Sequence, residues 1–444
     1  MNWKRLRIIS LRLVPWPVLG LAVLFLTAGV LYGAEEDLKL NDLIQEGLKN
    51  SPEILASQSR SQAADHRIPQ AKALPDPMFM FGYQNESFNK ITLGEAENAM
   101  GMFTLSQQFL FPGKQGLKGE MAARDAENLA ALYETARLRV TAQIKTVFYD
   151  LFFAYRNIDI LKDRLELFNR IEEAAASRYA SGMGSQQEVL MAQTEKYMIS
   201  EKEEMQRQKV QALQGMLNTV VGREVNAPLA RPGRLTPTPM EVNLERMLST
   251  ASSSSPALKA RRKMLEGAEA KVRFAERDYY PDFTLAAGYF PRGGLEPMWN
   301  LTATVNLAVY FSSKQKQAFL EAKAGLSEAK QELQAAELML ASSIRENFSM
   351  LQSADRLMKL YKEGVLPKSN QDVQLAFSGY VSGKVEALTV ITRIKNLLEV
   401  DILYWNQFVE REKAIARLEA LMGVNGVPNG TGSVVKALPN KEAR

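Results

Sequence analysis

The sequence contains no cysteine and only one histidine, His66, among its 444 residues. The absence of cysteine excludes disulfides and thiolate metal sites, and one histidine leaves too few imidazole ligands for a strong soft-metal site. His66 falls on the polar face of a predicted helix, where a surface role is the simpler interpretation. We therefore predict that the protein holds no metal and no cofactor.

The sequence also lacks the motifs of an enzyme. The segment Gly113-Lys114-Gln115-Gly116 does not have the spacing of a phosphate-binding loop. No base is placed to activate a serine or threonine nucleophile. Methionines near two predicted strands could suggest a copper site, but strand packing, loop filling or lipid contact explains them more simply. These methionines are Met78, Met80, Met100 and Met102.

Excess charge is nearly absent once the N-terminus is set aside. The formal net charge is +5, and four basic residues lie within the first 34, which leaves about +1 for the rest of the chain. The sequence therefore lacks the excess of positive charge that is typical of a nucleic-acid-binding protein. The four basic residues precede an apolar run over 14–32 and the small pair Gly33-Ala34, a pattern typical of a secretory signal peptide over 1–34. The length of the apolar run leaves an uncleaved anchor as the alternative.

Proline is missing from one long stretch, Lys114 to Tyr179, whose only glycines, Gly116 and Gly119, stand near its start. Apolar residues recur there at steps of three and four, which predicts one continuous helix with a single buried stripe. About 65 residues at ~1.5 Å per residue give a rod of roughly 100 Å. The stripe comprises Leu129, Tyr133, Ala136, Val140, Ile144, Val147, Leu151, Tyr155, Ile158, Leu161, Leu165 and Phe168.

The same unit of two strands, a long helix and a returning helix occurs twice. Ser51-Pro52 matches Ser255-Pro256, and Pro75-Asp76 matches Pro281-Asp282. The repetition of these segments in the same order predicts a duplicated domain, with halves at 35–225 and 241–423. The expected strands are 78–88, 101–111, 282–290 and 299–311, and the expected helices are 114–180, 186–220, 314–380 and 385–422. A proline-rich linker is expected at 226–240, and a disordered tail at 424–444.

Four strands with one apolar face pose a physical problem. An open sheet edge in lipid leaves unpaired backbone groups at a cost of several kcal/mol each, so only a closed barrel is tolerated there. Four strands cannot close a barrel, whereas three chains supply twelve. The predicted fold is therefore an α+β membrane protein, in which a trimeric twelve-strand β-barrel in the membrane continues into a long α-helical barrel.

The sequence resembles the TolC-like outer-membrane efflux proteins, which are the exit ducts of tripartite pumps. The resemblance covers about Leu38 to Met422. It rests on Ser51-Pro52, on the run 74–77 (LPDP), on the strand-to-helix junction Phe111, Pro112, Gly113 and Lys114, and on the hairpin segments that begin at Tyr179 and Tyr380. The junction is similar to that of members serving heavy-metal and related RND-type pumps.

The resemblance implies a homotrimer in the outer membrane of a Gram-negative bacterium that extends into the periplasm. It also implies a periplasmic adaptor protein and an inner-membrane pump of the RND type as partners. The adaptor would dock at the hairpin tips Ser181, Gly182, Met183, Gly184, Ser185, Ser382, Gly383 and Lys384. The pore constriction would lie at Glu188, Thr389 and Thr392. Members often carry a second carboxylate where this sequence has threonine, so any cation-favouring ring rests on Glu188, for which a solvated helix-start residue is the alternative.

The predicted function is a passive duct for small molecules or ions. The alternative is a periplasmic coiled-coil scaffold or pump adaptor held by an uncleaved signal. An adaptor needs several further β-rich modules, whereas the sequence offers four strands. The clean alternation over 300–311 also favours a lipid-facing strand.

Overall fold

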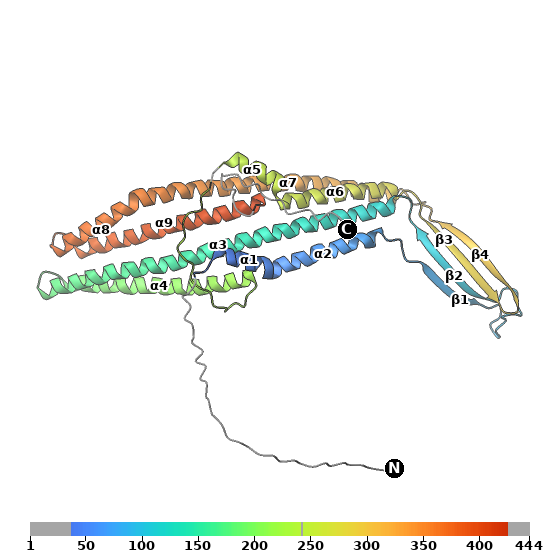
Figure 1. Ribbon diagram of the computed structural model, residues 1–444, viewed down its shortest axis with the longest axis horizontal. Coiled ribbons are helices and arrows are strands. Elements are labelled where there is room, and N and C mark those ends of the chain that lie inside the picture. The colour runs from blue at the N-terminus through green and yellow to red at the C-terminus, as the bar shows by residue number, and fades with distance from the viewer. Residues whose placement is uncertain (1–36, 241–242, 425–444) are drawn as a thin grey trace, which may run out of the picture. The chain divides into compact units, whose positions relative to one another are not determined.

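A computed structural model describes residues 37–240 and 243–424 (Figure 1). The predicted signal peptide and all of the predicted tail except Val424 lie outside these ranges. Among the described residues, no helix combines the length and the apolar character needed to cross a membrane. The elements are α1 (Leu40–Asn50), α2 (Pro52–Lys72), β1 (Met78–Gln84), β2 (Met100–Phe109), α3 (Lys114–Ala180), α4 (Gln186–Val221), α5 (Leu244–Ser254), α6 (Pro256–Arg277), β3 (Phe283–Arg292), β4 (Leu295–Val305), α7 (Gln315–Leu360), the π-helical turn η1 (Tyr361–Val365), α8 (Leu366–Val381) and α9 (Ala387–Met422).

The element order is the same in the two halves of the chain. Two helices lead into a strand pair, which is followed by a long helix and a helix that returns along it. The long helix α3 packs against α2, α4, α6 and α9, while α7 packs against α6 and α9 (Figure 1). The helices of the two halves therefore share one packed layer.

The helix α3 has 67 residues, and eight of the twelve residues in its predicted apolar stripe are buried, while Leu129, Tyr133, Tyr155 and Leu165 are half-buried. Val140, Ile144 and Leu151 are fully enclosed in one cluster that also takes in α4 and α9, and Phe168 is enclosed in a second cluster nearer the hairpin end. Burial of this stripe is the main source of the helix's stability, because helices gain more from packing an apolar face than from intrinsic propensity.

The helix expected over 314–380 is interrupted. One turn, Tyr361–Val365, is π-helical, and the N–H of Leu366 bonds to the carbonyl of Tyr361 five residues earlier. Pro367 follows this turn at the start of α8 and has no N–H to donate to the preceding turn. The wider turn accommodates that loss without ending the helix.

The four strands form one antiparallel sheet in the order β1-β2-β3-β4. The central pair, β2 and β3, joins the two halves, and Phe103 lies opposite Tyr289. The neighbouring pairings extend that row across the sheet, with Phe81 opposite Phe103 and Trp299 opposite Tyr289. All four of these side chains are exposed, so one face of the sheet is apolar in every strand.

The outer strands differ from the sequence prediction. β4 was expected at 299–311 but spans Leu295–Val305, because the hairpin to β3 closes tightly through Gly293 and Gly294. Gly293 has a positive φ of 68°, which favours glycine in such a turn. The pairing ends at Phe283 opposite Val305, since Pro281 lies just before β3 and cannot donate a ladder bond.

The first strand ends earlier than predicted. β1 was expected at 78–88 and stops at Gln84 because the Asn85 side chain organises the loop that follows. Its Oδ1 accepts a bond from the Thr92 N–H at 2.8 Å, and its Nδ2 donates to the Lys90 carbonyl at 2.8 Å. Such Asn-centred bonds compete with strand pairing.

Candidate functional site

The two hairpin ends share one turn geometry. At the end of α3 the Met183 N–H bonds to the Arg178 carbonyl at 2.8 Å, and at the end of α8 the Lys384 N–H bonds to the Gly379 carbonyl at 2.8 Å. Within these two turns, Gly182 has a φ of 72° and Gly383 a φ of 75°. This is the Schellman arrangement, whose left-handed position favours glycine. The two predicted tip glycines therefore serve the turn itself.

A chain of side-chain contacts ties the two hairpin ends of one protomer together. Arg178 donates from Nη1 to the Tyr380 carbonyl and from Nη2 to the Met183 carbonyl, both at 3.0 Å. Its guanidinium lies 5.0 Å from the centre of the Tyr380 ring. The Tyr380 hydroxyl then donates to Glu188 Oε2 at 2.8 Å. We call Arg178, Tyr380 and Glu188 the hairpin clasp.

The environment of Tyr380 keeps its hydroxyl protonated. The side chain is fully enclosed, and burial raises the pKa of Tyr380 above its ordinary value. The hydrogen bond and the negative charge of Glu188 raise that pKa further. Because the phenol stays neutral, it remains a donor to the carboxylate.

The predicted constriction residues do not form one group within a protomer. Glu188 is half-buried and engaged in the hairpin clasp, whereas Thr389 and Thr392 are exposed. Thr392 donates from Oγ1 to the Leu388 carbonyl at 2.8 Å, a bond within its own helix. Sequence reasoning assigned no role to Arg178, and it treated Tyr380 only as a landmark. The repeated tyrosine three residues before each tip glycine was the available signal.

The first strand-to-helix junction is closed by a buried lysine. Lys114, only 2% exposed, donates to the Tyr280 carbonyl at 2.8 Å and pairs with Asp282 at 3.0 Å and Asp278 at 3.2 Å. Asp282 also accepts the Phe111 N–H at 2.7 Å. These bonds attach the start of α3 to the segment that leads into β3.

Two further contacts complete the first junction. The Phe111 ring stacks on the Tyr280 ring at 4.5 Å. Arg277 donates to the Pro112 carbonyl at 2.8 Å and lies against Gly113, where a side chain would collide with it. The predicted junction residues 111–114 are thus brought together with the second half of the chain, a partnership that sequence reasoning did not identify.

The corresponding junction after β4 is open. Phe311 and Lys314 occupy the positions of Phe111 and Lys114, yet both are exposed. Among the described residues, Lys314 has no ion-pair partner. The two junctions therefore differ in their surroundings, and their sequences share the phenylalanine and the Lys-Gln pair but not Pro112-Gly113, which Ser312-Ser313 replaces.

The residues considered for metal binding are dispersed. His66 is exposed on α2, and Met78 and Met80 are exposed on the edge strand β1. Over 37–240 and 243–424, no group of three or more histidine, cysteine, aspartate or glutamate side chains is placed to hold a metal ion.

Two known metal-resistance proteins are similar to this chain in sequence. The chain is 22% identical to the nickel-cobalt-cadmium resistance protein NccC of Alcaligenes xylosoxydans xylosoxydans, over 61% of each protein. It is 23% identical to the cobalt-zinc-cadmium resistance protein CzcC of Cupriavidus metallidurans, over 70% of this chain and 74% of that protein. The alignment to NccC thus spans less than two thirds of that relative's length.

Solved structures share the fold. The outer membrane protein VceC of Vibrio cholerae superposes with a TM-score of 0.76 at 20% identity, over 87% of this chain and 96% of that one. The MtrE outer membrane channel of Neisseria gonorrhoeae gives a TM-score of 0.70 at 15% identity, over 87% and 89%.

A family model for outer membrane efflux proteins matches residues 43–223 and 247–424, one segment in each half of the chain. The family predicted from the sequence is confirmed, and it is a family of transport proteins and not of enzymes. It also favours the duct over the alternative of a periplasmic scaffold or adaptor. Because the two matched segments make up most of the sequence, the chain belongs to the outer membrane efflux protein family.

Proposed function

We propose that the protein is the outer-membrane exit duct of a tripartite efflux system, and that three copies form one continuous channel. The observation that carries this proposal is the sheet, which has an apolar face in every strand and two unpaired edges, β1 and β4. Exposed apolar rows of this kind suit lipid. The opposite face carries Thr104, Asn300 and Thr302, side chains that suit a water-filled lumen.

Closure requires that β4 of one protomer pair with β1 of the next. Every residue of β4 is exposed, and Trp299 and Leu301 are 74% and 75% exposed. Three copies then give twelve strands and leave no free edge in the membrane. The residues after Val305 continue the apolar alternation through Leu307 and Val309 without a partner strand in this chain. In the trimer we expect this segment to extend β4 along β1 of the partner subunit.

The two junctions support a specific contact between subunits of the proposed trimer. Within one chain, Lys114 pairs with Asp282 at the entry to β3. The repeat places Lys314 in the position of Lys114 and Asp76 in the position of Asp282, and both are exposed. We therefore assign Asp76 of the partner subunit as the acceptor for Lys314. In the proposed contact, Lys72 stands at the position that matches Asp278, so Lys314 would have one carboxylate partner where Lys114 has two. We therefore expect the junction between subunits to be weaker than the junction within the chain.

A charge exchange tests this assignment. Lys314→Asp and Asp76→Lys should each lower the yield of trimer in detergent, and the double exchange should restore it. Lys330→Asp, on the helix α7 that begins directly after Lys314, is the matched control. If both single variants form trimers in the wild-type yield, the Lys314–Asp76 contact is overturned, whereas the trimer itself is not. A folded monomer with intact sheet would overturn the duct itself.

The cargo follows from the relatives as a proposal. NccC and CzcC are named for resistance to nickel, cobalt, zinc and cadmium. We infer that this duct serves a pump for divalent metal cations, and that the ions pass without a resident site. The test is complementation of a strain that lacks its own metal-efflux duct, with growth measured in cobalt, zinc and cadmium. Growth unchanged from the empty strain, despite correct trimer in the outer membrane, would overturn this cargo.

The hairpin ends form the proposed periplasmic entrance. Both tips lie at the end of a helix that starts at the sheet, and α3 alone has 67 residues, or roughly 100 Å. Adaptor docking is assigned to the segments 181–185 and 382–384, in which Met183 and Lys384 are exposed. The pump behind this adaptor is proposed to be of the RND type.

The proposed constriction is a ring of three Glu188 carboxylates, one from each protomer. Since each is hydrogen-bonded to Tyr380, the ring and the hairpin clasp would share one group. Glu188→Gln should lower the cation preference of the channel in planar bilayers, whereas Glu195→Gln, farther along α4, should not. Equal selectivity in both variants would remove Glu188 from the passage.

A further inference from the structure

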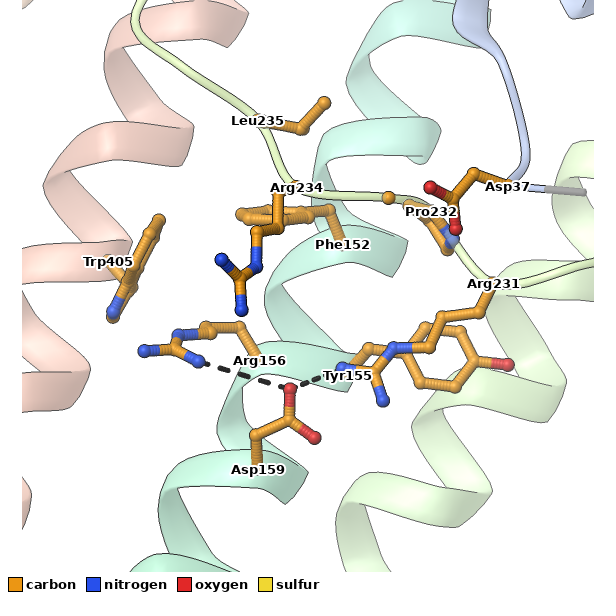
Figure 2. Close-up of a pocket in the computed structure, with 11 residues that line it drawn as sticks. Asp37, Phe152, Tyr155, Arg156, Asp159, Arg231, Pro232, Arg234, Leu235 and Trp405 are labelled. Carbon is orange, nitrogen blue, oxygen red and sulfur yellow. Dashed lines mark hydrogen bonds and ion pairs between the residues drawn. The ribbon is translucent and has the colours of Figure 1, made fainter.

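A cavity of about 810 Å³ lies between α3 and α9 and is covered by the linker segment 231–235 (Figure 2). Its charged lining consists of three arginines, Arg156, Arg231 and Arg234, and two aspartates, Asp37 and Asp159. Its apolar walls include Phe152 and Trp405, whose rings meet at 5.7 Å. Arginine predominates in this cavity, and neither the hairpin ends nor the sheet forms part of it.

The walls of the cavity are held by bonds within the chain. The Leu38 N–H donates to the Arg231 carbonyl at 3.0 Å, which attaches the linker to the start of the described chain. Farther along the linker, the Thr238 N–H donates to the buried Glu412 carboxylate at 3.0 Å. The cavity is therefore a built feature of the fold and not a gap beside a free loop.

The charges within the cavity are not balanced. Asp159 is shared, because it pairs with Arg231 and also lies 4.0 Å from Arg156. Arg234 has no ion-pair partner among the described residues. Figure 2 shows its guanidinium directed toward that of Arg156, between Phe152 and Trp405, with Asp37 on the other side of the linker. Two guanidinium groups therefore face one space without a carboxylate between them.

The Arg156 side chain is also fixed in orientation. Its guanidinium lies 4.7 Å from the centre of the Trp405 ring, and its buried Nε finds no acceptor within the described residues. Guanidinium groups held in place suit the bidentate binding of carboxylate or phosphate. The adjacent rings and Leu235 supply an apolar surface beside that binding point.

From this geometry we propose that the cavity binds a small organic oxyanion, in which a carboxylate or phosphate group is attached to an apolar or aromatic body. The anionic group lies between Arg156 and Arg234, and the apolar body packs on Phe152 and Trp405. This binding does not depend on the duct function, since the cavity is formed within a single protomer.

The chain supplies its own reporter. Its four tryptophans are Trp3, Trp16, Trp299 and Trp405, of which the first two fall in the predicted signal peptide. In the processed protein, Trp299→Phe leaves Trp405, on the cavity wall, as the single fluorescent tryptophan. The experiment titrates this variant in detergent with phenyl phosphate, with benzoate, and with benzyl alcohol as the neutral analogue, while potassium chloride controls for ionic strength.

We expect a saturable change in Trp405 emission with phenyl phosphate, benzoate or both, and the two anions distinguish a phosphate from a carboxylate ligand. Added in the same background, Arg234→Gln should weaken binding roughly tenfold or more, because charge-assisted bonds are lost. Arg207→Gln, on the exposed face of α4, should leave it unchanged. Arg234 is exposed on the linker, so its replacement should not impair folding.

Three results would overturn the proposal. The first is the absence of a saturable response to either anion. The second is an equal response to benzyl alcohol or to potassium chloride, which would mean apolar contact or charge screening only. The third is equal affinity in the Arg234→Gln and Arg207→Gln proteins.

Discussion

The two hairpin ends have the same backbone and different side chains. Tyr179 and Tyr380 precede the two tip glycines by three residues each, yet Tyr179 is 51% exposed and Tyr380 is fully buried. Arg178 corresponds to Gly379, and Glu188 corresponds to Thr389. One hairpin therefore supplies both the cation and the carboxylate, while the other supplies the tyrosine between them.

The two strand-to-helix junctions show the same divergence of surroundings. Lys114 is buried against two aspartates of the second half, whereas Lys314 is exposed. Duplication preserved the elements, while the position of each copy in the chain determines which contacts are made within the chain. In the proposed trimer, the contact that the first copy makes within its own chain would be made by the second copy with a partner subunit.

The largest effect should follow removal of the buried lysine. Lys114→Ala leaves Asp278 and Asp282 without their cation and should lower the free energy of unfolding by about 3 kcal/mol. Lys314→Ala should change the stability of a protomer by less than about 0.5 kcal/mol, since that side chain is exposed. Denaturant unfolding followed by circular dichroism compares the two. Equal losses would show that the junctions do not differ as the structure indicates.

The two faces of β4 should respond differently to a charge. Leu301→Arg places a cation on the apolar face and should cost about 2–4 kcal/mol if that position lies at the middle of the bilayer. Thr302→Arg, one residue later, faces the proposed lumen and should be tolerated. The amount of folded protein in outer-membrane fractions measures both. Similar yields from the two variants would mean that the sheet faces are wrongly assigned. The apolar positions 307 and 309 are unsuitable for this test because they lie outside β4.

The hairpin clasp should make a smaller contribution. Tyr380→Phe removes the bond to Glu188 and should destabilise the closed arrangement of the hairpins by roughly 1–2 kcal/mol. Tyr179→Phe, at the matching position of the other hairpin, should have almost no effect. Single-channel recordings should show more frequent opening for Tyr380→Phe alone. Identical opening in both variants would show that the clasp does not hold the entrance closed.

The raised pKa of Tyr380 gives the clasp a dependence on pH. A tyrosine whose pKa is higher in the folded state contributes stability that is present below its ordinary pKa, about 10, and is lost as pH rises above that value. The wild type should therefore unfold at a lower temperature in alkaline solution than at neutral pH. Burial also raises the pKa of Tyr149, so Tyr380→Phe should reduce this pH dependence without removing it. An unchanged pH profile in that variant would contradict the assignment.

The smallest effect on stability should come from the exposed tip residues. Met183→Glu and Lys384→Glu leave both turn glycines in place and should change stability by less than about 0.5 kcal/mol. If the adaptor docks at the tips, both should lower metal resistance and adaptor crosslinking while trimer yield stays normal. Lys202→Glu, farther along α4, serves as the control. Normal crosslinking in both tip variants would remove the tips from the docking surface.

The elements with a periodic pattern could be predicted from the residues alone. The apolar stripe from Ala136 to Phe168 predicted one long helix because only a helix places those residues on one face. The duplicated order of elements and the apolar parity of 299–305 were also readable, since both are properties of neighbouring residues along the chain. The family followed from ordered motifs such as residues 111–114.

The strand ends and the partners of individual side chains depend on three-dimensional packing and could not be predicted from the residues alone. Alternation continues to Phe311, but β4 stops at Val305 because a strand extends only where a partner strand supplies hydrogen bonds. Glu188 could be read as a pore residue, yet its bond to Tyr380 joins residues 192 positions apart in sequence. Lys114 and Lys314 occupy matching positions between a phenylalanine and a glutamine, and the packing of the segment between α6 and β3 against the first of them buries it, whereas the second is exposed. Such contacts depend on the chain returning to the same place in space, which no local pattern of residues specifies.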